Sequence, residues 1–222
     1  MLKAVRPVPT QTLGQSTYAE IRRQILHGEL SPGEFVSERV LADRLQAGMS
    51  AVRVAVQRLA AEGFIVVQPR RGIVVASQSI QDVVDLFQIR LMIEQRVVRN
   101  IAGRLSAVQV TSLRVLMPPL QEALAAGDAT RVVECDFAFH QRMCELQGNK
   151  HLAAVLERIL VGLYRETWIT TSMLPDHGID VLLKHEGIID AIEKGEGARA
   201  EQLLREHVTL GEQTVLSRRP AR

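Results

Sequence analysis

The chain of 222 residues lacks three things that would place it in a special class: a set of cysteines, abundant aromatic residues and a long apolar run. Its two cysteines, Cys135 and Cys144, are too few for a disulfide framework. No run of about 18 apolar residues could cross a membrane, and residues 1–14 lack the apolar segment of a signal peptide. We therefore expect a cytoplasmic protein with no membrane partner.

Aromatic residues make up 4 % of the chain and hydrophobic residues 46 %. This composition excludes a disordered chain and predicts aliphatic cores, which long helices pack well. The net charge of +2 is unevenly spread, because residues 1–78 carry ten Lys and Arg against six Asp and Glu, whereas residues 79–222 carry 17 against 19. The basic first third indicates a nucleic-acid partner for that region.

Residues 15–76 carry the pattern of three short helices followed by a hairpin. Apolar residues at helical spacing predict helices over 17–27 and 50–62, and Ser37 is a suitable N-cap for a helix over 38–45. Two β-branched runs then flank a turn at Pro69-Arg70-Arg71 and predict a two-stranded wing over 64–76. This order is typical of a winged helix-turn-helix, although a small α+β module with another role has the same pattern.

In a helix-turn-helix, the second of the paired helices enters the major groove, and its first exposed residues reach base edges. An arginine there can bind guanine bidentately, and arginines at a wing tip can meet phosphates. Surface arginines that are simply solvated would look the same in sequence. The predicted DNA-contacting residues are Arg39, Met49, Ser50, Arg53, Arg70, Arg71 and Gly72.

After a linker at 77–79, apolar residues recur at helical spacing throughout residues 80–216. Short connections between the segments predict an antiparallel bundle, and the Pro118-Pro119 pair should kink or split the second segment. Residues 1–14 and 217–222 are expected to be a flexible arm and a tail. The fold class is therefore mainly α, an N-terminal winged helix-turn-helix plus a C-terminal all-α six-helix bundle. The six segments lie near 80–104, 106–126, 128–147, 149–173, 178–195 and 197–216.

Four residues of the bundle have the chemistry of metal ligands. Asp136 and His140 are four residues apart and share one face of a helix, where a carboxylate and an imidazole can chelate one ion. His185 and His207 lie in the last two segments, each beside an apolar periodicity, so a bundle interior could bring all four together. From spacing alone, an Asp-x-x-x-His pair on a helix is more often a surface pair or a satisfied core contact than a metal site.

The first domain resembles the DNA-binding domain of the GntR family over about residues 15–76. The resemblance lies in Ile25-Leu-His-Gly-Glu-Leu-Ser-Pro-Gly-Glu34, in Ser37-Glu-Arg39 and in Leu59-Ala-Ala-Glu-Gly63. Family members often read Ser-Arg-Thr-Pro-Val-Arg into the recognition helix, whereas this chain reads Gly48-Met-Ser-Ala-Val-Arg53. Met49 thus stands where the first base-contacting arginine of the family usually stands, which implies a different operator sequence.

Residues 80–216 resemble the FCD effector domain of FadR-type GntR proteins, and the six segments resemble the VanR-like subgroup. The resemblance implies a divalent ion (Zn, Ni or Mn) on Asp136, His140, His185 and His207, and a small carboxylate effector that completes the coordination of the ion. It also places Arg90 toward the effector carboxylate, although a simple Arg90–Glu94 helix pair is as consistent with the sequence.

The sequence therefore predicts a homodimeric, ligand-responsive regulator of a catabolic operon that reads two operator half-sites. Two alternatives remain: a metal-dependent hydrolase using the Asp and three His, and a DNA-binding protein whose bundle only dimerises. Asn149 is interpreted as a helix N-cap and Cys144 as a buried thiol. The remaining histidines, which have no partners at ligand spacing, are interpreted as surface residues: His27, His151 and His177.

Overall fold

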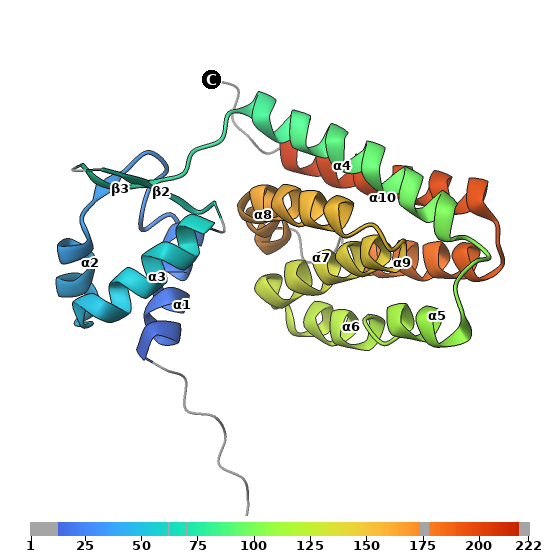
Figure 1. Cartoon of the computed structure of the whole chain (residues 1–222), viewed down its shortest axis with the longest axis horizontal. Helices are drawn as coiled ribbons and strands as arrows, with labels where there is room; N and C mark the ends of the chain where they lie inside the picture. The colour runs from blue at the N-terminus through green and yellow to red at the C-terminus, as the bar shows by residue number, and fades with distance from the viewer. Residues whose placement is uncertain (1–12, 62, 70, 174–177, 218–222) are drawn as a thin grey trace, which may run out of the picture. The chain divides into compact units, whose positions relative to one another are not determined.

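The computed structural model divides the chain into two compact units, with the boundary between Ser77 and Gln78 (Figure 1). The expected arm lies largely outside the described residues, as do Arg70, His177 and the end of the expected tail. The described residues are 13–61, 63–69, 71–173 and 178–217.

The first unit is a winged helix-turn-helix, as the sequence predicted. Its hairpin, β2 and β3, pairs Ile65 with Val75 and Gln68 with Gly72. A short strand that the sequence analysis missed, β1, adds to β3, so the antiparallel sheet has the order β1-β3-β2. The elements are α1 (Leu13–Leu26), β1 (Phe35–Val36), α2 (Glu38–Leu45), α3 (Met49–Ala61), β2 (Ile65–Gln68) and β3 (Gly72–Val75).

Local signals explain the ends of two helices in this unit. The Ser37 side chain accepts a hydrogen bond from the backbone N–H of Val40 and caps α2 as expected. Helix α1 begins at Leu13, earlier than predicted, and the hydroxyls of Ser16 and Thr17 donate to the Leu13 carbonyl within its first turns. The predicted arm at 1–14 is therefore too long by two residues at its end.

The second unit is helical throughout its described residues outside short connections. The second expected segment is split into α5 and α6, as the Pro118-Pro119 pair predicted, because proline is tolerated only in the first turn of a helix. The helices are α4 (Ile80–Ile101), α5 (Ala107–Arg114), α6 (Met117–Ala126), α7 (Ala129–Leu146), α8 (Lys150–Met173), α9 (Gly178–Glu193) and α10 (Gly197–Leu216).

Helix packing in the second unit brings distant parts of the sequence together. Helix α4 runs alongside α10, α7 packs against α8, and α9 packs against α10 (Figure 1). Ser79 and Asp82 form a capping box that fixes the start of α4 directly after the unit boundary. Among the described helices, none is both long enough and apolar enough to span a bilayer.

Candidate functional site

The four predicted ligand residues converge in the interior of the second unit. Asp136 and His140 come from α7, His185 from α9 and His207 from α10, and their ligand atoms lie within 4.8 Å of one another. Asp136 Oδ1 is 3.7 Å from His140 Nε2, 3.1 Å from His185 Nε2 and 3.6 Å from His207 Nε2. The His140 Nε2 atom is 3.0 Å from His207 Nε2 and 3.4 Å from His185 Nε2.

These side chains are nearly inaccessible to water. His140 and His185 are fully buried, and Asp136 and His207 are 7 % and 8 % exposed. The alternative of a surface Asp136–His140 pair is therefore wrong. The Oδ1 atom of Asp136 has no hydrogen-bond donor, because its short contacts with the imidazoles lack hydrogen-bond geometry.

The arrangement fits a divalent cation. Ligand atoms about 2.1 Å from a common centre lie about 3.0 Å apart at octahedral angles and about 3.4 Å apart at tetrahedral angles. The measured separations of 3.0 to 3.7 Å are close to these values. A buried carboxylate oxygen without a donor, facing three imidazole nitrogens, is costly unless a cation joins them.

The Glu94 carboxylate of α4 holds one of the imidazoles in place. Its Oε2 lies 2.5 Å from His140 Nδ1, and its Oε1 accepts a hydrogen bond from Arg90 Nε at 2.8 Å. Donation from His140 Nδ1 to this carboxylate directs Nε2 toward the cluster, as is usual where a histidine binds a metal. The sequence analysis considered Glu94 only as a helix partner of Arg90 and missed its contact with His140.

The electrostatics of the cluster favour neutral imidazoles on two helices. Burial lowers the pKa of His207 well below its usual range and lowers that of His185. Burial also opposes the charged form of His140, but the Glu94 and Asp136 carboxylates together outweigh burial and raise the pKa of His140. For Asp136, burial would raise the pKa, yet the imidazoles beside it hold the pKa well below its usual range.

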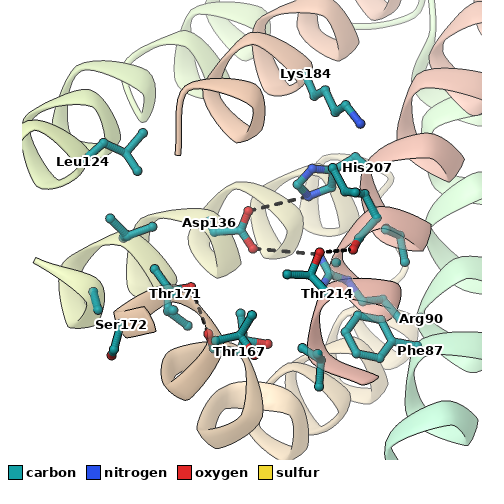
Figure 2. A pocket seen from close by; sticks show the side chains of 18 of the residues that line it. Phe87, Arg90, Leu124, Asp136, Thr167, Thr171, Ser172, Lys184, His207 and Thr214 are labelled. Carbon is teal, nitrogen blue, oxygen red and sulfur yellow. Dashed lines mark hydrogen bonds and ion pairs between the residues drawn. The ribbon is translucent and has the colours of Figure 1, made fainter. Parts of the chain in front are cut away.

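A cavity of about 140 Å³ lies beside the cluster (Figure 2). Arg90 and Asp136 line it, and Arg90 Nη2, 4.0 Å from Asp136 Oδ2, has no hydrogen-bond partner although the residue is only 3 % exposed. Arg90 therefore does two things: it pairs with Glu94 through Nε and presents Nη2 at the cavity. The sequence analysis did not identify the other polar residues that line this cavity: Thr167, Thr170, Thr171, Ser172, Lys184 and Thr214.

Several other sequence interpretations are confirmed. The Asn149 side chain accepts hydrogen bonds from the backbone N–H groups of His151 and Leu152 at the start of α8, so Asn149 is an N-cap. Cys144 is fully buried, and burial raises the pKa of its thiol to about 12, so the thiol is inert. His27 and His151 are exposed.

The predicted DNA-reading residues of the recognition helix lie on one face of α3. Met49 is 39 % exposed and Ser50 and Arg53 are exposed, as is Gln57 one turn further on. The Arg53 side chain, 65 % exposed, forms an ion pair with Glu38 of α2 through an Nε–Oε2 distance of 3.1 Å. This pair holds the guanidinium near the outer face of both helices.

The remaining predicted DNA contacts lie at two other places in the first unit. Arg39 is exposed in α2, and Arg71 is exposed at the turn of the wing. Gly72 has a φ of 104°, and a Cβ there would lie 3.0 Å from the Val36 carbonyl oxygen. Strand pairing by itself therefore requires glycine at this position, whatever approaches it from outside.

The geometry of both units agrees with the families that the chain matches. Residues 13–75 match the bacterial regulatory proteins of the gntR family, and residues 85–210 match the FCD domain. Since the FCD match covers more than half of the chain, this protein belongs to the GntR family of regulators with an FCD domain.

Individual relatives agree along most of the chain. The HTH-type transcriptional repressor RspR of Escherichia coli strain K12 is 26 % identical over 200 residues, which are 90 % of this chain and 87 % of RspR. The uncharacterized HTH-type transcriptional regulator YdhC of Bacillus subtilis strain 168 is 24 % identical over 194 residues, or 86 % of this chain and 85 % of YdhC. The solved structure of E. coli McbR/YncC has the same fold, with a TM-score of 0.73 at 18 % identity over 94 % of this chain and 99 % of that one.

The protein is therefore a DNA-binding transcription regulator and not an enzyme. Both sequence relatives are transcription regulators, so the hydrolase alternative from the sequence analysis is wrong.

Proposed function

We propose that this protein senses a small organic acid through a divalent ion held by Asp136, His140, His185 and His207, and thereby controls the transcription of a catabolic operon. One observation carries the proposal: the buried Asp and three His adjoin a cavity that is also lined by Arg90, whose Nη2 has no hydrogen-bond partner. FCD domains are commonly metal-binding, which supports the same interpretation.

Each residue of the site has a distinct part in effector binding. The three imidazoles and the Asp136 carboxylate hold the ion, which supplies a positive charge and open coordination positions for a carboxylate. Arg90 Nη2, which has no hydrogen-bond partner in the structure, meets the same carboxylate from the side of α4. Glu94 positions His140 and keeps the Arg90 side chain extended toward the cavity.

The DNA-binding part of the proposal rests on exposed residues of the first unit. We expect Met49, Ser50 and Arg53 to approach base edges and Arg39 and Arg71 to meet phosphates, with Gly72 at the base of the wing. Arg70, which lies outside the described residues, is expected to meet phosphates as well. GntR regulators typically act as dimers, so we expect a cytoplasmic homodimer on a two-part operator.

The test is the metal content of purified protein. Wild-type protein should contain about one divalent ion per chain, and His185→Ala should contain none while still binding operator DNA. His151→Ala, which removes an exposed imidazole, is the matched control and should retain the ion. Equal metal content in wild type and His185→Ala, or none in either after supplementation, would falsify the metal site.

A further inference from the structure

The cavity beside the metal cluster has two unlike sides. In Figure 2, Arg90, His207 and Lys184 lie on one side, and Leu124, Thr171 and Ser172 lie on the other. A ligand that fills the cavity therefore meets charge at one end and a different environment at its other end.

The charged side can receive a single carboxylate. Arg90 Nη2 lacks a hydrogen-bond partner, and Lys184 has no ion-pair partner among the residues that the structure describes. Within the described lining, no cation stands on the side of Leu124 and Thr171. A second carboxylate on the ligand would find no charge partner among the described residues of that side.

Several hydroxyls around the cavity have already used their hydrogen atoms, whereas the buried Thr167 Oγ1 has no hydrogen-bond partner. Thr171 donates to the Thr167 carbonyl, Ser172 to the Trp168 carbonyl and Thr214 to the Leu210 carbonyl, at 2.8, 2.8 and 2.6 Å. They present only oxygen lone pairs and methyl groups to a ligand. A second carboxylate, which only accepts hydrogen bonds, therefore gains no hydrogen bond from these three hydroxyls, and most hydroxyls of a sugar acid would face the apolar part of the lining.

The size and the apolar lining indicate a compact body. The cavity measures about 140 Å³, and Phe87, Leu124, Val133 and Val208 supply apolar surface to it. A cavity of about 150 Å³ lined by Leu, Ile and Phe holds one benzene molecule. The body of the ligand should thus be about as large as one ring.

We propose that this cavity selects a monocarboxylic acid with an apolar body about the size of a benzene ring. The carboxylate lies toward Arg90 and the metal cluster, and the body lies against Leu124 and the hydroxyl side. This inference rests on the proposed function and names the class of effector that the same site accepts.

The test compares four acids on full-length protein loaded with Zn²⁺. Isothermal titration calorimetry measures the binding of benzoate, 4-methylpentanoate, succinate and gluconate. Benzoate and 4-methylpentanoate should each bind about tenfold or more tightly than succinate and gluconate, because the latter two leave buried polar groups without partners.

A pair of variants tests the placement of the body. Leu124→Lys puts a cation on the apolar side and should reverse the preference toward succinate, whereas Val155→Lys, at an exposed position of α8 outside the cavity, should leave the order of the four acids unchanged. If Leu124→Lys does not fold, Leu124→Ala replaces it in the test. The alanine variant enlarges the cavity and should therefore bind 1-naphthoate more tightly than benzoate.

The outcomes of these experiments distinguish a failure of the inferred ligand class from a failure of the proposed organic-acid sensing. Tighter binding of succinate or gluconate to the Zn²⁺-loaded wild type overturns the ligand class and leaves organic-acid sensing intact. Failure of all four acids to bind the Zn²⁺-loaded protein overturns both. Unchanged selectivity in both Leu124 variants overturns the placement of the apolar body.

Discussion

The two units of this protein treat charged residues in opposite ways. In the first unit, the described interior is apolar apart from Thr17 and Gln24, and Arg39, Arg53 and Arg71 are exposed. The second unit buries charge at its centre. Among the described residues of this unit, the buried acidic, basic and histidine residues are Arg90, Glu94, Asp136, His140, Glu166, His185 and His207.

The difference shows where each unit places its recognition chemistry. A surface that reads DNA needs exposed cations over an ordinary apolar core, because phosphate contacts are made at the surface. A sensor needs polar groups inside, where a low dielectric strengthens each contact and leaves an unpaired group costly. The first unit should thus fold without a ligand, whereas the second should gain stability when its centre is filled.

Removal of the ion should produce the largest contrast between the units. At a free ion concentration about 1,000 times its Kd, binding stabilises the folded state by about 4 kcal/mol, which a chelator removes. Hydrogen exchange on the full chain should show faster exchange in α7, α9 and α10 after chelation, and unchanged exchange in α1 and α3. Equal increases in hydrogen exchange in both units would contradict the expectation that only the second unit is stabilised by the ion.

Glu94→Gln tests whether the buried carboxylate positions His140. The change keeps the size of the side chain but removes the charge that faces His140 Nδ1, so metal affinity should fall about 10- to 100-fold. Glu186→Gln, an exposed neighbour of His185, is the control and should bind the ion as wild type does. The readout is competition with a metal-binding dye. Comparable affinities in the two variants would mean that Glu94 only pairs with Arg90.

Arg53→Ala should act on the other unit alone. If Arg53 reads a guanine, its loss costs about 1–3 kcal/mol of specific DNA binding and leaves metal content unchanged. Fluorescence anisotropy with operator DNA gives the affinity, and Arg44→Ala, an exposed arginine of α2, is the comparison. If Arg53→Ala binds the operator with the affinity of wild type, Arg53 does not contact a base edge.

The pH dependence of ion binding should come from His140. Its pKa is raised in the metal-free protein, so the imidazolium must lose the Nε2 proton before that nitrogen can bind a cation. Below this raised pKa, affinity should fall about tenfold per pH unit, and about one proton should be released per ion bound. Above it, the dependence should vanish. Calorimetry in two buffers of different ionisation enthalpy measures the number of protons released per ion bound. A value near zero at low pH would contradict the assignment of the pH dependence to His140.

Helix caps should give the smallest effect and no contrast between the units. Ser37 caps α2 and Ser106 caps α5 through the same kind of side-chain hydrogen bond, so alanine at either position should cost about 1 kcal/mol. Thermal unfolding of each variant gives the cost. A much larger loss for one of them would show that local helix signals also differ between the units.

The sequence predicted best those features that depend on residues close together in the chain. The Ser37 cap, the Pro118-Pro119 break and the hairpin around Gly72 all depend on residues within one turn or one loop. Strand β1 was missed because Phe35 and Val36 form a strand only by pairing with β3, about forty residues away in the chain. Periodicity within a short window cannot reveal such a partner.

The sequence predicted the four candidate metal ligands but not the residues that surround them. Asp136 and His140 share a helical face, so their pairing follows from spacing. Glu94 reaches His140 across 46 positions of sequence, and only the packing of α4 against α7 brings them together. The hydroxyls from Thr167 to Ser172 form a visible run in an apolar helix, which is the signal that could have suggested a cavity.

The capping box at Ser79 fixes the start of α4, and the helix then continues unbroken to Arg90, which lines the cavity. Between Ile80 and Arg90 the helix is continuous and about 15 Å long, at 1.5 Å per residue. A tilt of about 10° around the Arg90 position would move the Ser79 end by about 2.6 Å, by simple trigonometry on that length. Ala76, Ser77 and Gln78 connect this end to the last residue of β3, so this short linker would have to accommodate a displacement of that size.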